Sequence, residues 1–267
     1  MSESARRSRF RFHILSLGLF TAMLVGASSL GAAQVNIERL RGGEATEGFA
    51  NSLGLDFSIR YGNVDIQRVG VETRTDYVRG AHTALLLIQG RFGWNDGEQF
   101  SDEGLAHLRY TFQLSERVLP ELFVQADFDS PRRLEFRALI GGGFRFGLHD
   151  GERVSTWLGT DYMLEHERLD GSETSVAEPE VTVHRWSNYV TANLDFGERA
   201  GGSLTVYAQP RFDALEDARV LGEARFDARL VGAVALTLTF RLRNDTRPPT
   251  DTKSFDAEVT SGVLIRF

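Results

Sequence analysis

The feature of this sequence that most restricts its fold is a long alternation of apolar and polar residues with a period of two. One face of the segment 134–146 is almost wholly apolar and consists of Leu134, Phe136, Ala138, Ile140, Gly142, Phe144 and Phe146. The other face carries mainly charges and glycines. This period is typical of β-strands with one apolar and one polar face. No sustained helical period occurs in residues 34–267, so the sequence predicts an all-β fold.

Twelve segments of this kind are separated by clusters of Gly, Asn, Asp and Ser. We expect strands at residues 49–61, 66–78, 81–94, 103–114, 118–128, 134–146, 153–169, 182–196, 203–212, 218–229, 232–243 and 254–267. The break near residues 230–232 is weak, so a count of ten strands also stays open.

The length of these segments favours a membrane-spanning barrel. Most run for more than ten residues, whereas a strand of a soluble protein has about 5–6 and a strand that crosses a bilayer at a tilt needs about 9–11. The longest connections, at residues 95–102, 170–181 and 244–253, fall at one end, like the outer loops of bacterial barrels. We predict a single antiparallel transmembrane β-barrel at residues 49–267. A soluble periplasmic ligand-binding β-barrel is the alternative.

Aromatic residues mark both ends of the predicted strands. One end carries Tyr77, Phe112, Phe146, Phe196 and Phe267, and the other carries Tyr61, Phe92, Trp94, Phe128, Phe212 and Phe240. Membrane barrels have such girdles where lipid meets water, whereas a soluble sandwich buries its large aromatics in mid-strand. The aromatic pattern therefore agrees with the membrane interpretation.

The first 33 residues have the pattern of a secretory signal peptide. Four arginines precede an apolar stretch at residues 14–25, and Gly31 and Ala33 are small residues before a cleavage site. The apolar stretch is shorter than the ~20 residues of a membrane-spanning helix. We therefore expect export to the outer membrane of a Gram-negative bacterium, with a short periplasmic segment at residues 34–48.

The C-terminal strand carries a second export feature. An open sheet edge in lipid leaves backbone groups unpaired, so the first and last strands are expected to pair and close the barrel. The chain ends on Phe267, preceded on the same face by Ile265, Val263 and Val259. This ending looks like the assembly signal of outer-membrane proteins and implies the barrel-assembly machinery as a partner. Outer-membrane lipid and lipopolysaccharide are the other expected partners.

Three stretches carry a family resemblance: SIRYGNVDIQRVGVETRTDYVRG, FVQADFDSPRRLEFRALIGGGFRF and LRNDTRPPTDTKSFDAEVTSGVLIRF. Within these stretches the resemblance rests on the turn at residues 62–65, Gln125 with Arg137, the glycines at 141–143, and the ending 256–267. The chain resembles the domain-of-unknown-function 481 family of expected outer-membrane barrels, which includes proteins described as salt-induced. The resemblance covers nearly all of the chain after the signal peptide. It implies the fold and carries over no catalytic residue.

Composition and motifs exclude several chemistries. The chain has no cysteine, which rules out disulfides, thiolate metal sites and a cysteine nucleophile. Its net charge of −7 opposes general nucleic-acid binding, which needs a basic face. No nucleotide or metal motif occurs. We therefore expect no cofactor, no metal and no enzymatic activity.

An outer-membrane lipid or peptide hydrolase is the enzymatic alternative. A lipid-cleaving barrel needs a serine beside a histidine, and the nearest candidates are His184, Ser187 and Asn188. In a strand, His184 shares a face with Asn188 while Ser187 lies on the other face, which opposes a catalytic pair. An aspartate-based peptidase could use Asp127 and Asp129, but no suitably spaced histidine accompanies them.

The polar faces combine arginines with carboxylates. The predicted interior charges are Arg60, Glu72, Arg74, Arg109, Glu121, Asp127, Glu135, Arg137, Arg145, Asp161, Arg211 and Arg225. On inward faces they would pair across neighbouring strands. They would form either the wall of a narrow channel for ions or small solutes, or an ion-pair network that fills a structural barrel. Twelve strands lie between filled small barrels and open porins, so the strand count does not decide.

Overall fold

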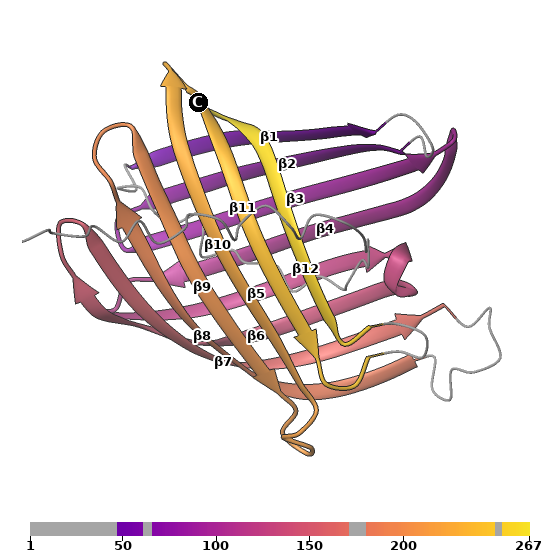
Figure 1. Cartoon of the computed structure of the whole chain (residues 1–267). Helices are drawn as coiled ribbons and strands as arrows, with labels where there is room; N and C mark the ends of the chain where they lie inside the picture. Colours follow the sequence, from indigo (N-terminus) through magenta and orange to yellow (C-terminus); the bar gives the residue numbers. More distant parts are fainter. Residues whose placement is uncertain (1–46, 61–65, 171–179, 249–252) are drawn as a thin grey trace, which may run out of the picture.

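The computed structural model describes residues 47–60, 66–170, 180–248 and 253–267 (Figure 1). The strands are β1 (Gly48–Arg60), β2 (Ile66–Arg79), β3 (His82–Asn95), β4 (Glu98–Phe112), β5 (Val118–Asp129), β6 (Leu134–Asp150), β7 (Val154–Leu169), β8 (Glu180–Asp195), β9 (Ala200–Pro210), β10 (Ala218–Val231), β11 (Val234–Asp245) and β12 (Phe255–Arg266), with a short 3₁₀ helix η2 (Ser130–Arg132). Within these residues, no helix combines the length and hydropathy needed to cross a bilayer.

The strands form one closed antiparallel barrel in which each strand pairs with its neighbours in sequence. β1 closes the barrel by pairing with β12, where Leu53 lies opposite Ile265 and Leu55 opposite Val263. The terminal residue extends this closure, because Phe267 and Asn51 exchange two backbone hydrogen bonds of 2.9 Å. The predicted all-β barrel of twelve strands is therefore confirmed.

The structure corrects one predicted loop. Residues 95–102 do not form a long connection, because β3 and β4 are joined by a tight turn at Asp96 and Gly97. Both turn residues have positive φ, 49° and 84°, which suits the Asp-Gly pair to a two-residue hairpin. Most of this predicted connection is therefore strand. The other long connections include residues 171–179 and 249–252, which lie outside the described residues, as do residues 61–65 and the proposed signal peptide with Gly31 and Ala33.

The two faces of each strand have opposite chemistry. On β5, buried Glu121, Gln125 and Asp127 alternate with exposed Leu122 and Val124. The same alternation occurs around the barrel. Exposed outward residues include Leu86, Ile88, Leu108, Ile140, Val190, Leu204, Val206, Leu236, Phe240, Leu242 and Val259. The apolar face of the sheet is thus the outer surface, and the polar face is the interior.

Aromatic rings gather near the strand ends, as predicted. Exposed rings at one end include Phe92, Phe128 and Phe212, and those at the other end include Tyr77, Phe196 and Phe267. Phe112 and Phe146 are only partly exposed. Phe226 lies short of the end of β10, with its ring centroid 6.0 Å from that of Phe196. Phe240, predicted at a strand end, lies five residues before the end of β11. Two bands of aromatic side chains therefore flank the apolar outer surface.

Candidate functional site in the barrel interior

Ion pairs between neighbouring strands line the interior. Asp127 on β5 receives Arg137 of β6 at 2.7 Å, and Glu121 on β5 receives Arg109 of β4 at 3.1 Å. All four side chains are buried. Such pairs are the interaction expected between facing positions of adjacent strands, and charge-assisted hydrogen bonds are roughly twice as strong as neutral ones.

Other contacts cross the interior between strands that are not neighbours. The hydroxyl of Tyr189 on β8 donates to Glu121 on β5 at 2.8 Å. Arg219 on β10 donates to Glu165 at 2.8 Å and to Glu167 at 3.0 Å, both on β7. Because two strands separate the members of each pair, these side chains must reach through the interior of the barrel. Side chains therefore join strands that lie a quarter of the way round the barrel from each other.

Glu165 is the centre of one of these networks. Its carboxylate also receives Arg185 of β8 at 3.1 Å, and its side chain is only 2% exposed. Arg185 in turn contacts Asp217, which follows β9. A carboxylate so buried is stable only when it is paired and hydrogen-bonded. Glu165 therefore joins three strands through two arginines.

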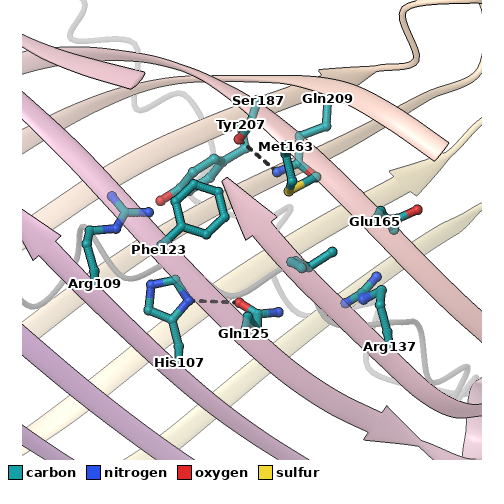
Figure 2. A pocket seen from close by; sticks show the side chains of 11 residues that line it. His107, Arg109, Phe123, Gln125, Arg137, Met163, Glu165, Ser187, Tyr207 and Gln209 are labelled. Carbon is teal, nitrogen blue, oxygen red and sulfur yellow. Dashed lines mark hydrogen bonds between the residues drawn. The ribbon is translucent and has the colours of Figure 1, made fainter. Parts of the chain in front are cut away.

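A small cavity remains beside this network (Figure 2). Its volume is about 30 Å³, which gives room for one or two water molecules. Polar lining residues come from several strands and include the hydrogen-bonded pairs His107 with Gln125, 3.0 Å apart, and Gln209 with Ser187, 2.9 Å apart. Phe123 and Met163 supply apolar walls (Figure 2). This cavity is therefore small and lined by both polar and apolar side chains.

Most of the predicted interior charges face inward in the structure. The buried members are Arg74, Arg109, Glu121, Asp127, Arg137, Arg145, Asp161 and Arg225. Glu72 is partly exposed and contacts Gln89. Arg145 lies over the ring of Trp157, 4.3 Å from its centroid. The alternation assigned these side chains to one face of each strand, although it did not identify their partners.

Three predicted residues lie elsewhere. Glu135 is half exposed and pairs with Arg168 at 2.7 Å, because the strand register shifts beside it. Arg211 follows β9 and contacts Asp213 and Asp217, at 2.8 and 3.2 Å. The hydrogen bond from Arg211 lowers the pKa of the Asp213 carboxyl. The side chain of Arg60 is outside the described part of the structure.

Several interior residues were missed by the sequence analysis. Arg219 lies two positions before Leu221 and four before Glu223 on β10, so the alternation could have identified it. Tyr189 was missed because an aromatic side chain carries no charge to mark it. Arg132 lies in η2, outside any alternating segment, and contacts Asp129 at 3.5 Å. No sequence pattern predicts this turn residue as part of the interior.

The candidate hydrolytic residues do not meet. Ser187 is buried in the interior and accepts a hydrogen bond from Gln209. His184 is on the outer face, where its Nδ1 lies 2.5 Å from the hydroxyl of Tyr162. Asp127 and Asp129 are both buried, with Asp127 tied to Arg137. Within the described residues, no three metal-binding side chains cluster.

Comparisons with solved structures find outer-membrane barrels. The NanC porin is 7% identical with a TM-score of 0.48, covering 81% of this chain and 98% of that one. The translocator domain of the autotransporter NalP from Neisseria meningitidis is 11% identical with a TM-score of 0.46, covering 84% and 90%. The KdgM porin is 8% identical with a TM-score of 0.42, covering 82% and 99%. Identities and scores this low say nothing about what this chain binds.

Among curated proteins, none matches this chain. A family model does match, over residues 53–267, which is almost the whole described barrel. The match agrees with the resemblance noted in the sequence. The chain belongs to DUF481, a family described as proteins of unknown function.

Proposed function

We propose that this protein is a non-enzymatic outer-membrane β-barrel of a Gram-negative envelope, with a structural role and an interior closed by its own side chains. The single observation that carries this proposal is the set of side-chain contacts that cross part of the interior. Tyr189 with Glu121, and Arg219 with Glu165 and Glu167, bridge strands that are not neighbours.

The distribution of polarity supports a membrane location. A soluble ligand-binding barrel has a polar surface and an apolar interior. Here Leu122 and Ile140 are exposed on the outside, while Glu121 and Arg137 are buried inside. Exposing such a continuous apolar surface to water is unfavourable, whereas lipid accepts it. Closure of the sheet also meets the requirement that backbone groups in lipid be paired.

The burial of the interior supports a closed barrel. Wall residues of a water-filled channel are in contact with solvent, so their side chains are accessible. In this barrel Glu121, Glu165 and Glu223 are each at most 2% exposed, and Thr191 and Thr205 are completely buried. Side chains therefore fill the interior around these five residues, as they do in small barrels. We therefore favour the filling network over an open channel wall.

A narrow channel for ions or small solutes is the second candidate. The specific observation in its favour is the polar cavity of about 30 Å³, which is lined by Arg109, Arg137 and Glu165. Conduction would require this cavity to become continuous with both ends. The contacts of Tyr189 and Arg219 would then have to break.

Conductance in a planar bilayer tests the proposal. The wild-type protein is expected to show no current steps above background, because Tyr189 and Glu121 bridge the interior. Tyr189→Ala is expected to produce resolvable steps, since it removes a large buried side chain at that bridge. The control is Tyr162→Ala, which removes an exposed tyrosine from the outer face and is expected to stay silent. Regular ohmic steps from the wild-type protein would favour the channel instead.

Assembly and lipid partners are part of the proposal. Phe267 is 75% exposed. Only its backbone is hydrogen-bonded to Asn51, so these bonds do not involve the ring. The assembly machinery could therefore recognise the ring with Ile265, Val263 and Val259 of the same face. Three further predictions belong here: export by residues 1–33, the periplasmic segment 34–48, and contact with lipopolysaccharide.

A further inference from the structure

The β1–β12 seam is parted over half of its length. The two strands pair only from Ser52 to Asp56 on β1 and from Gly262 to Arg266 on β12. Residues 57–60 and 255–261 belong to the same strands, yet within the described residues they have no partner across the seam. Figure 1 shows β1 and β12 meeting near the C-terminus and diverging from there.

Each unpaired segment is hydrogen-bonded to a neighbouring strand on its other side. β1 is paired with β2 along its whole length, and β12 is paired with β11 as far as Phe255. Among the described residues of β1 and β12, only the edges that face the seam are unpaired. An unpaired backbone group costs several kcal/mol in lipid, so a ligand, water or another strand must satisfy these groups.

The opening lies toward the outer side of the proposed membrane. Phe57 pairs with Val69, which pairs with Phe92, and Val259 pairs with Phe240. Phe92 belongs to the aromatic band at the end opposite the chain termini. The parted region therefore begins at this band and continues outward. A ligand that enters it would come from the outer leaflet.

The rim of the opening is apolar on its membrane side. Phe57, Ile59 and Val259 point outward and are 63%, 43% and 64% exposed. Ser58 has the parity of an interior residue but is also exposed, because no strand covers it. These exposed residues offer an acyl chain an apolar surface along the two strand edges.

Behind this rim the interior holds arginines together with carboxylates such as Glu258 and Asp256. Arg68 faces inward from β2, opposite Ser58, and its guanidinium carbon lies 5.5 Å from the ring centroid of Phe100. Its Nε is buried and has no hydrogen-bond partner among the described residues, where no carboxylate lies within ion-pair distance of it. Nearby, Glu258 is shared by Arg91 and Arg241, at 3.4 and 3.0 Å. Arginine favours phosphate because its planar donors match phosphate oxygens.

We propose that the parted seam is a lateral binding site for an outer-leaflet lipid with a phosphate headgroup. The acyl chains lie against Phe57, Ile59 and Val259, and the phosphate reaches Arg68 through the opening. Arg91, which is 28% exposed, stands beside the same entrance. This site needs no axial channel, so it is independent of whether the barrel conducts ions.

Native mass spectrometry of the delipidated barrel tests the headgroup contact. Incubated with dioleoyl phosphatidic acid, the wild-type protein is expected to retain one lipid. Dioleoylglycerol, with the same acyl chains and no phosphate, should be lost, and inorganic phosphate should not compete. Arg68→Gln is expected to weaken retention about tenfold, the size expected for loss of a charged hydrogen bond. Arg168→Gln, an exposed arginine on β7, is the matched control and should bind as the wild type does.

A disulfide across the seam tests the entrance. Continuation of the observed register places Ser58 opposite Thr260, and the chain has no native cysteine to interfere. Oxidised Ser58→Cys/Thr260→Cys is expected to lose the lipid and to regain it on reduction. Leu55→Cys/Val263→Cys, at a position already paired, should bind in both states.

The outcomes separate cleanly. The proposal would be overturned if wild type, Arg68→Gln and the oxidised seam variant retained the lipid equally. Efficient competition by inorganic phosphate would also overturn it, because it would indicate an anion site without lipid. Failure of the seam disulfide to form would support strands that stay apart, since the bond requires Cα atoms within about 7 Å. Arg68→Gln would then decide the question alone.

Discussion

Glu165→Ala is expected to destabilise the folded barrel by about 3–5 kcal/mol. Glu165 is buried and receives Arg185 from β8 and Arg219 from β10. Its removal leaves two guanidinium groups in the interior without their shared carboxylate. Breaking a buried pair on one side costs more than the pair itself contributes, because the remaining charge is already desolvated. Urea unfolding from lipid vesicles, followed by tryptophan fluorescence, measures the change in the free energy of unfolding.

The matched control is Glu135→Ala. Glu135 also pairs with an arginine, Arg168 at 2.7 Å, but both side chains are about half exposed. Exposed pairs contribute about 0–1 kcal/mol, so this variant should unfold close to the wild type. Equal effects of Glu135→Ala and Glu165→Ala would contradict a desolvated interior, because hydrated charges on both sides of the wall would respond alike.

Ile140→Arg is expected to cost about 2–4 kcal/mol, because it places an arginine on the outer face near the middle of β6. In water the same change at an exposed position would alter stability by no more than about 0.5 kcal/mol. The size of the destabilisation therefore depends on whether lipid or water surrounds the barrel. The same urea titration in vesicles gives the result.

Leu148→Arg serves as its control on the same strand. Ile140 and Leu148 have nearly equal exposure, 56% and 55%, but Leu148 lies two residues from the end of β6. Near the interface an arginine costs only about 0–1 kcal/mol. A large penalty at Ile140 and a small one at Leu148 is the depth dependence of a bilayer. Equal, small penalties at both positions would indicate an aqueous environment.

The sequence was sufficient to predict the barrel because strand alternation depends on local geometry. Side chains alternate between faces with a period of two, so Leu134 to Phe146 revealed both the strand and its apolar side. The hairpin at Asp96 and Gly97 was missed, although the Asp-Gly pair is a known turn signal. The following residues, from Glu98, looked too polar for a strand.

The interior contacts could not be predicted in the same way. Alternation assigns Tyr189 and Glu121 to inward faces, but their meeting depends on the tilt and stagger of the strands around the whole barrel. The parted seam has the same origin. The final strand alternates as regularly at Val259 as at Val263, yet only Val263 is paired with β1. Local patterns carry no information about where two strand edges separate.

Thiol accessibility along β9 tests most directly whether this is a filled barrel in a membrane. Ser203 and Thr205 face inward and are buried, whereas Leu204 and Val206 face outward and are exposed. Four single-cysteine variants at these positions are reconstituted into vesicles and treated with a charged, water-soluble thiol reagent or a lipid-soluble one. We expect the outward cysteines to react only with the lipid-soluble reagent and the inward cysteines to react with neither until the protein is denatured. Rapid reaction of the inward cysteines with the charged reagent would reveal a water-filled channel, and reaction of the outward cysteines with it would place the barrel in water; either result would contradict the account.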